Sequence, residues 1–306
     1  MRVITLDDAY VAARTAENVK RLIDDERVLA LFNLAGTPTT LAALPILEER
    51  KVPLIAPFTG SDALRAAFNR HVFNVRAGYG DEIGQIVRHL STLGVSKVAV
   101  AYLNNAFGKG ALAVADQSAR KHRVTVVSSA ALEVDGKGLQ DAVQTIAQGG
   151  PAALIVATAG KITSDFIAAY QQANTGAQFY ALSVVSSQQL LKELGDRSRG
   201  VVIAQVMPHP FAGNNVAARE LAALARRQGI ETVTYNHMEG FLSAKVLVEG
   251  LRRAGRALDR AALIRGIESM HEVDLGGFVV RFSDHNHNGS NYVELSVVGG
   301  SGRLLK

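Results

Sequence analysis

The sequence predicts an α/β protein with two lobes, each built on a largely parallel sheet covered by helices. Apolar strand patterns alternate with amphipathic helical patterns from residue 28 to residue 206. Strands and helices at this spacing form parallel sheets through right-handed crossovers. Roughly eight or nine parallel strands are more than a single sheet usually holds. A chain of 306 residues is long enough to form two hydrophobic cores. Two lobes are therefore favoured over one.

The patterns place each element in chain order. We expect strands at residues 28–34, 53–56, 73–76, 97–102, 123–128, 153–157, 179–182 and 201–206. We expect helices between them at residues 10–24, 40–50, 81–93, 108–121, 139–148, 161–173 and 187–194. After residue 207 the pattern is mostly helical, at residues 217–228, 238–253 and 259–269, and it ends in strands at residues 278–282 and 291–298.

Composition narrows the class of protein. The apolar share of 48% and the charged share of 20% are ordinary for a globular protein, and no apolar run approaches the roughly 18 residues of a membrane span. The net charge of +5 is spread over helical patterns, which favours solvated helix faces, so we expect no nucleic-acid partner. The absence of cysteine excludes disulfides and thiolate metal sites.

Enzyme and cofactor motifs are missing from the sequence. Residues 78–84 imitate a dinucleotide fingerprint, but the third glycine comes one place late. Residues 284–289 open like a calcium loop, yet Leu295 stands where a bidentate Glu is needed. We interpret this segment, with His285 and His287, as a solvent-exposed polar turn. We therefore predict no catalytic residue, no cofactor and no metal site.

Two loops carry the clearest functional signal. Residues 34–40 and 56–62 each follow an apolar strand, precede a helical pattern and are rich in Gly, Ser and Thr. Loops after successive parallel strands lie side by side at the edge of the sheet where ligands bind. Hydroxyls and free amides at helix N-termini favour a small anionic group such as a carboxylate. The loops therefore predict a binding site for a small polar molecule.

Two later strand ends leave alternatives open. Phe107 follows the strand at residues 97–102 and is either a packing residue or an aromatic cap on a ligand. Ser183 follows the strand at residues 179–182, where ligand contact competes with a helix N-cap role for Ser186 or Ser187.

The order and spacing of these stretches resemble the leucine/isoleucine/valine-binding protein family, the type I periplasmic solute-binding proteins of ABC importers. The matching segments are residues 28–39, 52–57, 73–76, 105–108, 240–255, 274–277 and 284–289. The resemblance covers essentially the whole chain. It implies two Rossmann-like lobes joined by a three-crossover hinge. Lobe 1 would hold residues 1–92 and 208–290, and lobe 2 residues 93–207 and 291–306.

The resemblance also assigns site residues in lobe 1. Gly36 and Thr37 lie in the first-strand loop, where Thr37 matches the hydroxyl residue that grips the ligand carboxylate. Phe58 and Thr59 match the second-strand loop, which contributes mainly backbone groups.

In lobe 2, Phe107 matches the aromatic position of the family. Ser183 matches the position that is an acid in the amino-acid binders, where it holds the ligand ammonium. Because serine cannot neutralise an ammonium, an amino-acid ligand needs another anion, for which Glu239 is one candidate beside its interpretation as a helix-face residue. A ligand without an ammonium, such as an aromatic or aliphatic carboxylate or an amide, is the alternative.

The function implied is that of the substrate-binding component of an ABC importer, not an enzyme. It would capture a small carboxylated solute (an amino acid or a related organic acid, aromatic acid or amide) between two lobes by hinge closure. Its partners would be the solute and permease subunits, and its location the periplasm. The alternative is a cytoplasmic ligand-sensing regulator of the same fold, of the amide-sensor type.

The start of the chain departs from the family pattern. Residues 1–8 do not read as a signal peptide. Residues 3–6 correspond to the second strand of lobe 1, so we expect a truncated sequence that lacks the leader and the first strand–helix unit.

Overall fold

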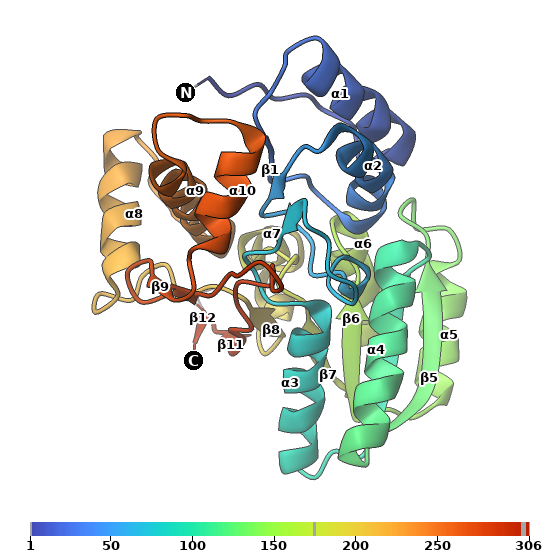
Figure 1. Cartoon of the computed structure of the whole chain (residues 1–306). Helices are drawn as coiled ribbons and strands as arrows, with labels where there is room; N and C mark the ends of the chain where they lie inside the picture. The colour runs from blue at the N-terminus through green and yellow to red at the C-terminus, as the bar shows by residue number, and fades with distance from the viewer. Residues whose placement is uncertain (1, 174–175, 301–303, 306) are drawn as a thin grey trace. The chain divides into compact units, whose positions relative to one another are not determined.

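The computed structural model describes residues 2–173, 176–300 and 304–305 (Figure 1). It divides into two compact units: Met1–Gly78 with Met207–Tyr292, called unit 1, and Tyr79–Val206 with Val293–Lys306, called unit 2. The chain therefore passes between the units after Gly78, after Val206 and after Tyr292. The predicted α/β class with mostly parallel sheets is confirmed.

The first part of unit 1 carries a small parallel sheet in the order β1-β2-β3. Its elements are α1 (Ala12–Asp24), β1 (Leu31–Phe32), α2 (Thr37–Arg50), β2 (Leu54–Ile55), the 3-10 turn η1 (Asp62–Leu64) and β3 (Val72–Phe73). Helices α1 and α2 pack against each other, as Figure 1 shows in blue. Their apolar faces meet β1 and β2 in one buried cluster that includes Val19, Leu31, Leu47 and Leu54.

The strands of unit 1 are shorter than the apolar runs that predict them. Each has two residues, although the runs at residues 28–34 and 53–56 are longer. The strand expected at residues 3–6 is not formed. Ile4 and Leu6 instead pack, partly buried, against the α1–α2 cluster, and Val3 is 76% exposed. The apolar side chains of residues 3–6 pack against helices, and their backbone has no neighbouring strand with which to form hydrogen bonds. Partial burial of side chains is therefore not enough to form a β-strand.

The second part of unit 1 is helical, as predicted. It comprises α8 (Val216–Arg227), α9 (Tyr235–Ala254), α10 (Arg260–Glu268) and the two-stranded antiparallel pair β9 (Val273–Asp274) and β10 (Val279–Val280). A capping box between Thr234 and His237 begins α9 earlier than the apolar pattern indicates. No helix in the described residues is long and apolar enough to cross a membrane.

His287 corrects the interpretation of residues 284–289 as an exposed turn. His285 is exposed, but His287 is 4% exposed and stacks on Phe73 with ring centroids 3.8 Å apart. Its neighbour Asn288 bridges Asn74 just beyond β3, so the segment lies beside the sheet. Burial lowers the pKa of His287, because a buried site disfavours the charged form of the imidazole ring. The polar character of residues 284–289 thus gave no indication that the side chain of His287 is buried.

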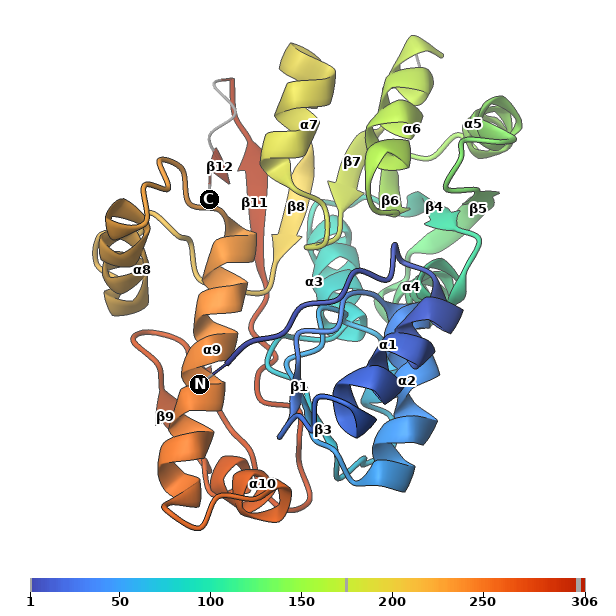
Figure 2. The same ribbon diagram turned by 90° about the horizontal axis from the view of Figure 1, so that it is seen from above.

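Unit 2 is built on a seven-stranded sheet in the order β12-β11-β8-β7-β6-β4-β5, in which β11 is antiparallel to its neighbours (Figure 2). Its strands are β4 (Lys97–Leu103), β5 (Thr125–Leu132), β6 (Ala153–Ala157), β7 (Gln178–Ala181), β8 (Val202–Gln205), β11 (Glu294–Val298) and β12 (Leu304–Leu305). Its helices are α3 (Tyr79–Thr92), α4 (Ala106–His122), α5 (Leu139–Gln148), α6 (Lys161–Gln172) and α7 (Ser187–Leu194), with the 3-10 turn η2 (Gly195–Ser198).

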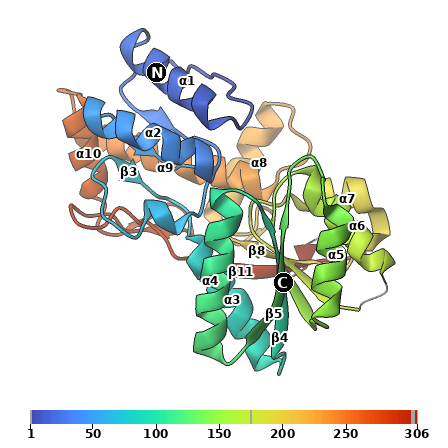
Figure 3. The ribbon, with the colours of Figure 1, turned by 90° about the vertical axis from the view of Figure 1, so that its right-hand side faces the viewer.

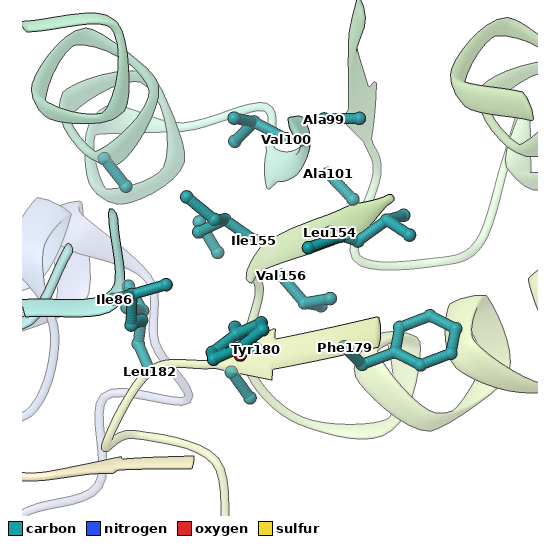
Figure 4. Packing of buried hydrophobic residues seen from close by; sticks show 14 of the residues in the cluster. Ile86, Ala99, Val100, Ala101, Leu154, Ile155, Val156, Phe179, Tyr180 and Leu182 are labelled. Carbon is teal, nitrogen blue, oxygen red and sulfur yellow. The ribbon is translucent and has the colours of Figure 1, made fainter. Parts of the chain in front are cut away.

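Helices cover both faces of this sheet. Helices α3 and α4 lie on one face, and α5, α6 and α7 on the other (Figure 3). The core is formed by continuous apolar strands such as β6, all five of whose residues are buried. Figure 4 shows Leu154, Ile155 and Val156 of β6 packed among their neighbours.

Helix α3 differs from the predicted division into lobes. The resemblance placed residues 81–92 in lobe 1, with a crossover near Leu93. Ile83, Ile86, Val87 and Leu90 are instead buried in the core of unit 2, so the first crossover follows Gly78. An amphipathic helix shows that one face is buried, but the pattern does not say against which sheet.

Gly108 is required by the close approach of α4 to β4. A Cβ atom at this position would lie 2.1 Å from the carbonyl oxygen of Leu103. We expect Gly108→Ala to lower the free energy of unfolding by about 1–3 kcal/mol, because backbone atoms must move. Gly110→Ala in the same helix is the matched control, since a Cβ there meets nothing within 4 Å. The control should stabilise by about 0.5–1 kcal/mol through helix propensity. Urea unfolding measures both, and equal effects would contradict the expectation.

Candidate functional site

The two hydroxyl-rich loops of unit 1 lie side by side, as predicted. Ala35 and Phe58 form a parallel bridge that extends the pairing of β1 with β2. The amide of Gly36 donates to the carbonyl of Phe58 at 3.1 Å, and the amide of Phe58 donates to Leu34 at 2.8 Å. The carboxyl ends of two parallel strands therefore bring Gly36, Thr37, Phe58 and Thr59 to one edge of the sheet.

Thr37 and Thr59 are joined directly. Their hydroxyl oxygens are 2.7 Å apart, and both side chains are almost fully buried. The amide of Ser61 donates to the Thr59 hydroxyl at 3.2 Å. Since each hydroxyl has one proton and accepts at two lone pairs, one hydroxyl proton of the pair is left for a further acceptor, whichever member donates to the other. The pair can therefore donate to an anion.

The N-terminus of α2 lies at the same loop. Gly36 is its N-cap, with φ of +96° and no side-chain cap. The first amides of a helix have no acceptor inside the helix, and they favour negative charge. The hydroxyls of Thr39 and Thr40 donate backward to the carbonyl of Gly36 at 2.9 and 2.6 Å. Of the three threonines in this turn, Thr37 is therefore the one whose hydroxyl forms a hydrogen bond with the loop at residues 56–62.

A buried ion pair stands beside these loops. Arg76 is 1% exposed, its guanidinium lies 3.3 Å from the carboxylate of Glu239, and it sits 5.4 Å above the centre of the Phe58 ring. Glu239 is therefore a buried partner of Arg76 rather than an exposed helix-face residue. This carboxylate faces a guanidinium within unit 1, so its charge is already balanced there.

In unit 2, Phe107 lies in the first turn of α4. Asn105 begins this helix by accepting from the amide of Gly108 at 3.1 Å. The Phe107 ring is 4% exposed, and its centre lies 4.9 Å from that of Tyr79. The packing role is therefore real, and ligand contact by this ring stays a prediction.

Ser183 lies at the carboxyl end of β7 and is held by a carboxylate. Its amide and its hydroxyl each donate to one oxygen of Glu82 at 2.8 Å. Glu82 is fully buried in the first turn of α3. Ser186 is the N-cap of α7 and accepts from the amide of Gln189. The capping role therefore belongs to Ser186, while Ser183 points to a different partner.

The first turn of α3 links the two predicted residues of unit 2. Tyr79 contacts Phe107 and Glu82 binds Ser183, although β6 separates β4 from β7 in the sheet. Sequence reasoning missed Tyr79, Glu82 and Arg76. One signal was available for Glu82: it lies on the same helical stripe as Ile86 and Leu90, where an acidic side chain is unusual. Within the described part of the chain, no three metal-ligating side chains gather.

Comparison with known proteins places the chain. A profile of the family described as "Periplasmic binding protein" matches residues 1–302. The comparison with curated proteins gives no match.

Many solved structures share the fold. One is "a possible leucine/isoleucine/valine-binding protein" from Rhodopirellula baltica SH 1, with 26% identity and a TM-score of 0.94 over 100% of this chain and 85% of that chain. A substrate-binding periplasmic protein from Ralstonia solanacearum has 29% identity and a TM-score of 0.91, covering 98% and 86%. An extracellular ligand-binding receptor from Verminephrobacter eiseniae ef01-2 has 27% identity and a TM-score of 0.92, covering 100% and 88%.

Proposed function

The chain belongs to the periplasmic binding protein family, and we propose that it is the substrate-binding component of an ABC importer. In this proposal the protein lies in the periplasm, where it captures a small carboxylated solute between its two units by hinge closure. It then delivers the solute to the permease subunits of the importer. The proposed ligand-binding residues are Gly36, Thr37, Phe58, Thr59, Phe107 and Ser183.

The observation that carries this proposal is the joined hydroxyl pair at the N-terminus of α2. Thr37 and Thr59 come from neighbouring strand ends and are 2.7 Å apart. Hydroxyl donors combined with the first amides of a helix suit a carboxylate oxygen. Unit 2 supports the proposal with its own strand-end residues, Phe107 and Ser183.

The fold alone does not identify the class of solute, so experiment has to determine it. A branched-chain amino acid ABC transporter protein from Thermus thermophilus was solved with bound valine, at 19% identity, a TM-score of 0.86 and coverage of 99% and 83%. A solute-binding protein from R. palustris was solved with benzoate, at 18% identity, a TM-score of 0.86 and coverage of 99% and 83%. At these identities the two structures support the fold alone, and they supply two probes, valine and benzoate.

Titration calorimetry on the purified protein tests the proposal. The panel contains branched-chain and aromatic amino acids, the corresponding acids without an amino group, benzoate and benzamide. The ligand-free state is prepared by unfolding and refolding, so that solute carried through purification does not block the site. We expect saturable binding of at least one carboxylate. Absence of binding across the whole panel by folded protein would overturn the proposal.

Cell fractionation tests the proposed location separately. We expect the protein in the periplasmic fraction, released by osmotic shock. Recovery in the cytoplasm together with solute binding would instead support the ligand-sensing regulator of the same fold.

A further inference from the structure

We propose that Arg65 is a positioning residue of the solute site, which holds the main chain of the loop at residues 56–62 so that the Thr59 hydroxyl lies against Thr37. This proposal rests on the proposed function, because it concerns the hydroxyl pair to which the solute carboxylate would bind. Arg65 directly follows the 3-10 turn η1 and is partly buried. Its guanidinium is not a member of the hydroxyl pair and acts on that pair through the backbone of the loop.

The guanidinium of Arg65 binds three main-chain carbonyls of unit 1. Nη1 donates to the carbonyl of Ser61 at 3.0 Å and to that of Thr59 at 3.4 Å. Nη2 donates to the same Thr59 carbonyl at 3.4 Å and to the Arg76 carbonyl at 3.2 Å. The guanidinium therefore spans the turn from residue 59 to residue 61 and joins this turn to the segment that follows β3.

The two loop residues that Arg65 holds also surround the Thr59 hydroxyl. The Ser61 amide donates to this hydroxyl at 3.2 Å, and the Thr37 hydroxyl lies 2.7 Å from it. Threonine is β-branched and has few χ1 rotamers open to it, so the backbone position of Thr59 determines where its hydroxyl lies. Through the two carbonyls, Arg65 fixes both the residue that carries the hydroxyl and the residue whose amide donates to it.

The third carbonyl ties the loop to a well-anchored segment. Arg76 is 1% exposed, and its side chain is ion-paired with Glu239. The aliphatic stem of Arg65 lies against Gly78, where a Cβ atom would be 3.1 Å from Cδ of Arg65. The stem and the guanidinium of Arg65 are therefore both restrained by residues 76–78.

A planar guanidinium suits this role better than an ammonium group. It has five N–H donors in a fixed fork, whereas lysine has three donors on one nitrogen atom. Lysine at position 65 would keep the positive charge without reproducing the set of hydrogen bonds that Nη1 and Nη2 make together. A site whose groups are fixed before the solute arrives loses less conformational freedom on binding. We therefore expect the contribution of Arg65 to appear in the affinity for the solute.

Calorimetry with the best-binding carboxylate of the panel tests the role in binding. We expect Arg65→Met to weaken binding about tenfold, because the Thr59 hydroxyl is no longer held in place. Arg65→Lys should weaken binding to a similar degree although it keeps the charge. Arg70→Met, at an exposed arginine five positions further along the chain, is the matched control and should bind as wild type does.

Thr59→Val tests whether Arg65 acts through the hydroxyl. Valine keeps the shape of threonine and removes the group that Arg65 positions. In the Thr59→Val protein we therefore expect Arg65→Met to change the dissociation constant by less than about twofold. General damage from the loss of Arg65 would instead weaken binding by the same factor in both backgrounds.

Amide hydrogen exchange in the ligand-free protein tests the geometry without a solute. The Ser61 amide donates to the Thr59 hydroxyl, so Arg65→Met should speed its exchange about tenfold or more. The Phe58 amide, which donates to the carbonyl of Leu34 at 2.8 Å, should exchange at its wild-type rate. NMR spectroscopy on the whole chain measures both rates.

The outcomes separate the two proposals. Wild-type affinity in folded Arg65→Met or Arg65→Lys would overturn the role of Arg65 and leave the proposed function intact. Equal weakening in the two Thr59 backgrounds, or unchanged exchange of the Ser61 amide, would do the same. Wild-type protein that binds no carboxylate of the panel would overturn the proposed function and this proposal with it.

Discussion

Arg76→Met should lower the free energy of unfolding by about 3–5 kcal/mol. The replacement leaves the carboxylate of Glu239 buried without the guanidinium that lies 3.3 Å away. Arg76 and Glu239 are 1% and 5% exposed, so neither side chain can turn to water for compensation. The position over the Phe58 ring adds a cation–π contact that methionine does not reproduce. Urea unfolding and calorimetric melting measure the loss.

Two further variants separate the ion pair from general damage. Arg76→Met combined with Glu239→Gln also neutralises the carboxylate that faced the guanidinium, so it should cost less than Arg76→Met alone. Arg252→Met breaks an exposed pair with Glu249, in which the arginine side chain is 77% exposed, and should cost about 0–1 kcal/mol. A loss for Arg76→Met as small as that for Arg252→Met would contradict the expectation.

The parts of the fold that local patterns determine could be predicted from the sequence. The alternation of strands and helices and the adjacency of the two hydroxyl-rich loops follow from periodicity and from the geometry of parallel sheets. Residues 34–40 and 56–62 needed no partner outside their own strand–helix units to be found. The boundaries were less accurate because the residues that begin a helix, such as Asn105 and Thr234, precede the apolar pattern.

The parts that depend on distant partners could not be predicted. Glu82 meets Ser183 across 101 positions, and Arg76 meets Glu239 across 163. Each of these residues has an innocuous local interpretation as a helix-face or strand-end residue. Only the packing of α3 on the sheet of unit 2, and of α9 beside the loops of unit 1, shows that the charged groups are buried together. The sequence alone could therefore not predict that the carboxylate of Glu82 lies next to Ser183.

Thr37→Val should weaken binding of the best carboxylate of the calorimetric panel by about 10- to 100-fold, because a hydrogen bond to a charged group contributes about 1.5–3 kcal/mol. Valine keeps the shape of threonine and removes the hydroxyl that lies 2.7 Å from that of Thr59. The partner hydroxyl also loses its neighbour, so we expect a loss of stability of about 0.5–1.5 kcal/mol as well.

Thr37→Ser distinguishes the hydroxyl from the packing of the side chain. It keeps the donor and removes only a methyl group, so binding should return to within about threefold of wild type if the hydroxyl grips the carboxylate. Thr145→Val, at an exposed helix position whose hydroxyl bonds the carbonyl of Asp141, should leave binding unchanged and controls for the loss of a threonine hydroxyl elsewhere. Equal binding by Thr37→Val and wild type would remove Thr37 from the site. Equal weakening by Thr37→Val and Thr37→Ser would instead assign its effect to the shape of the α2 N-terminus, leaving the helix amides as the donors to the solute.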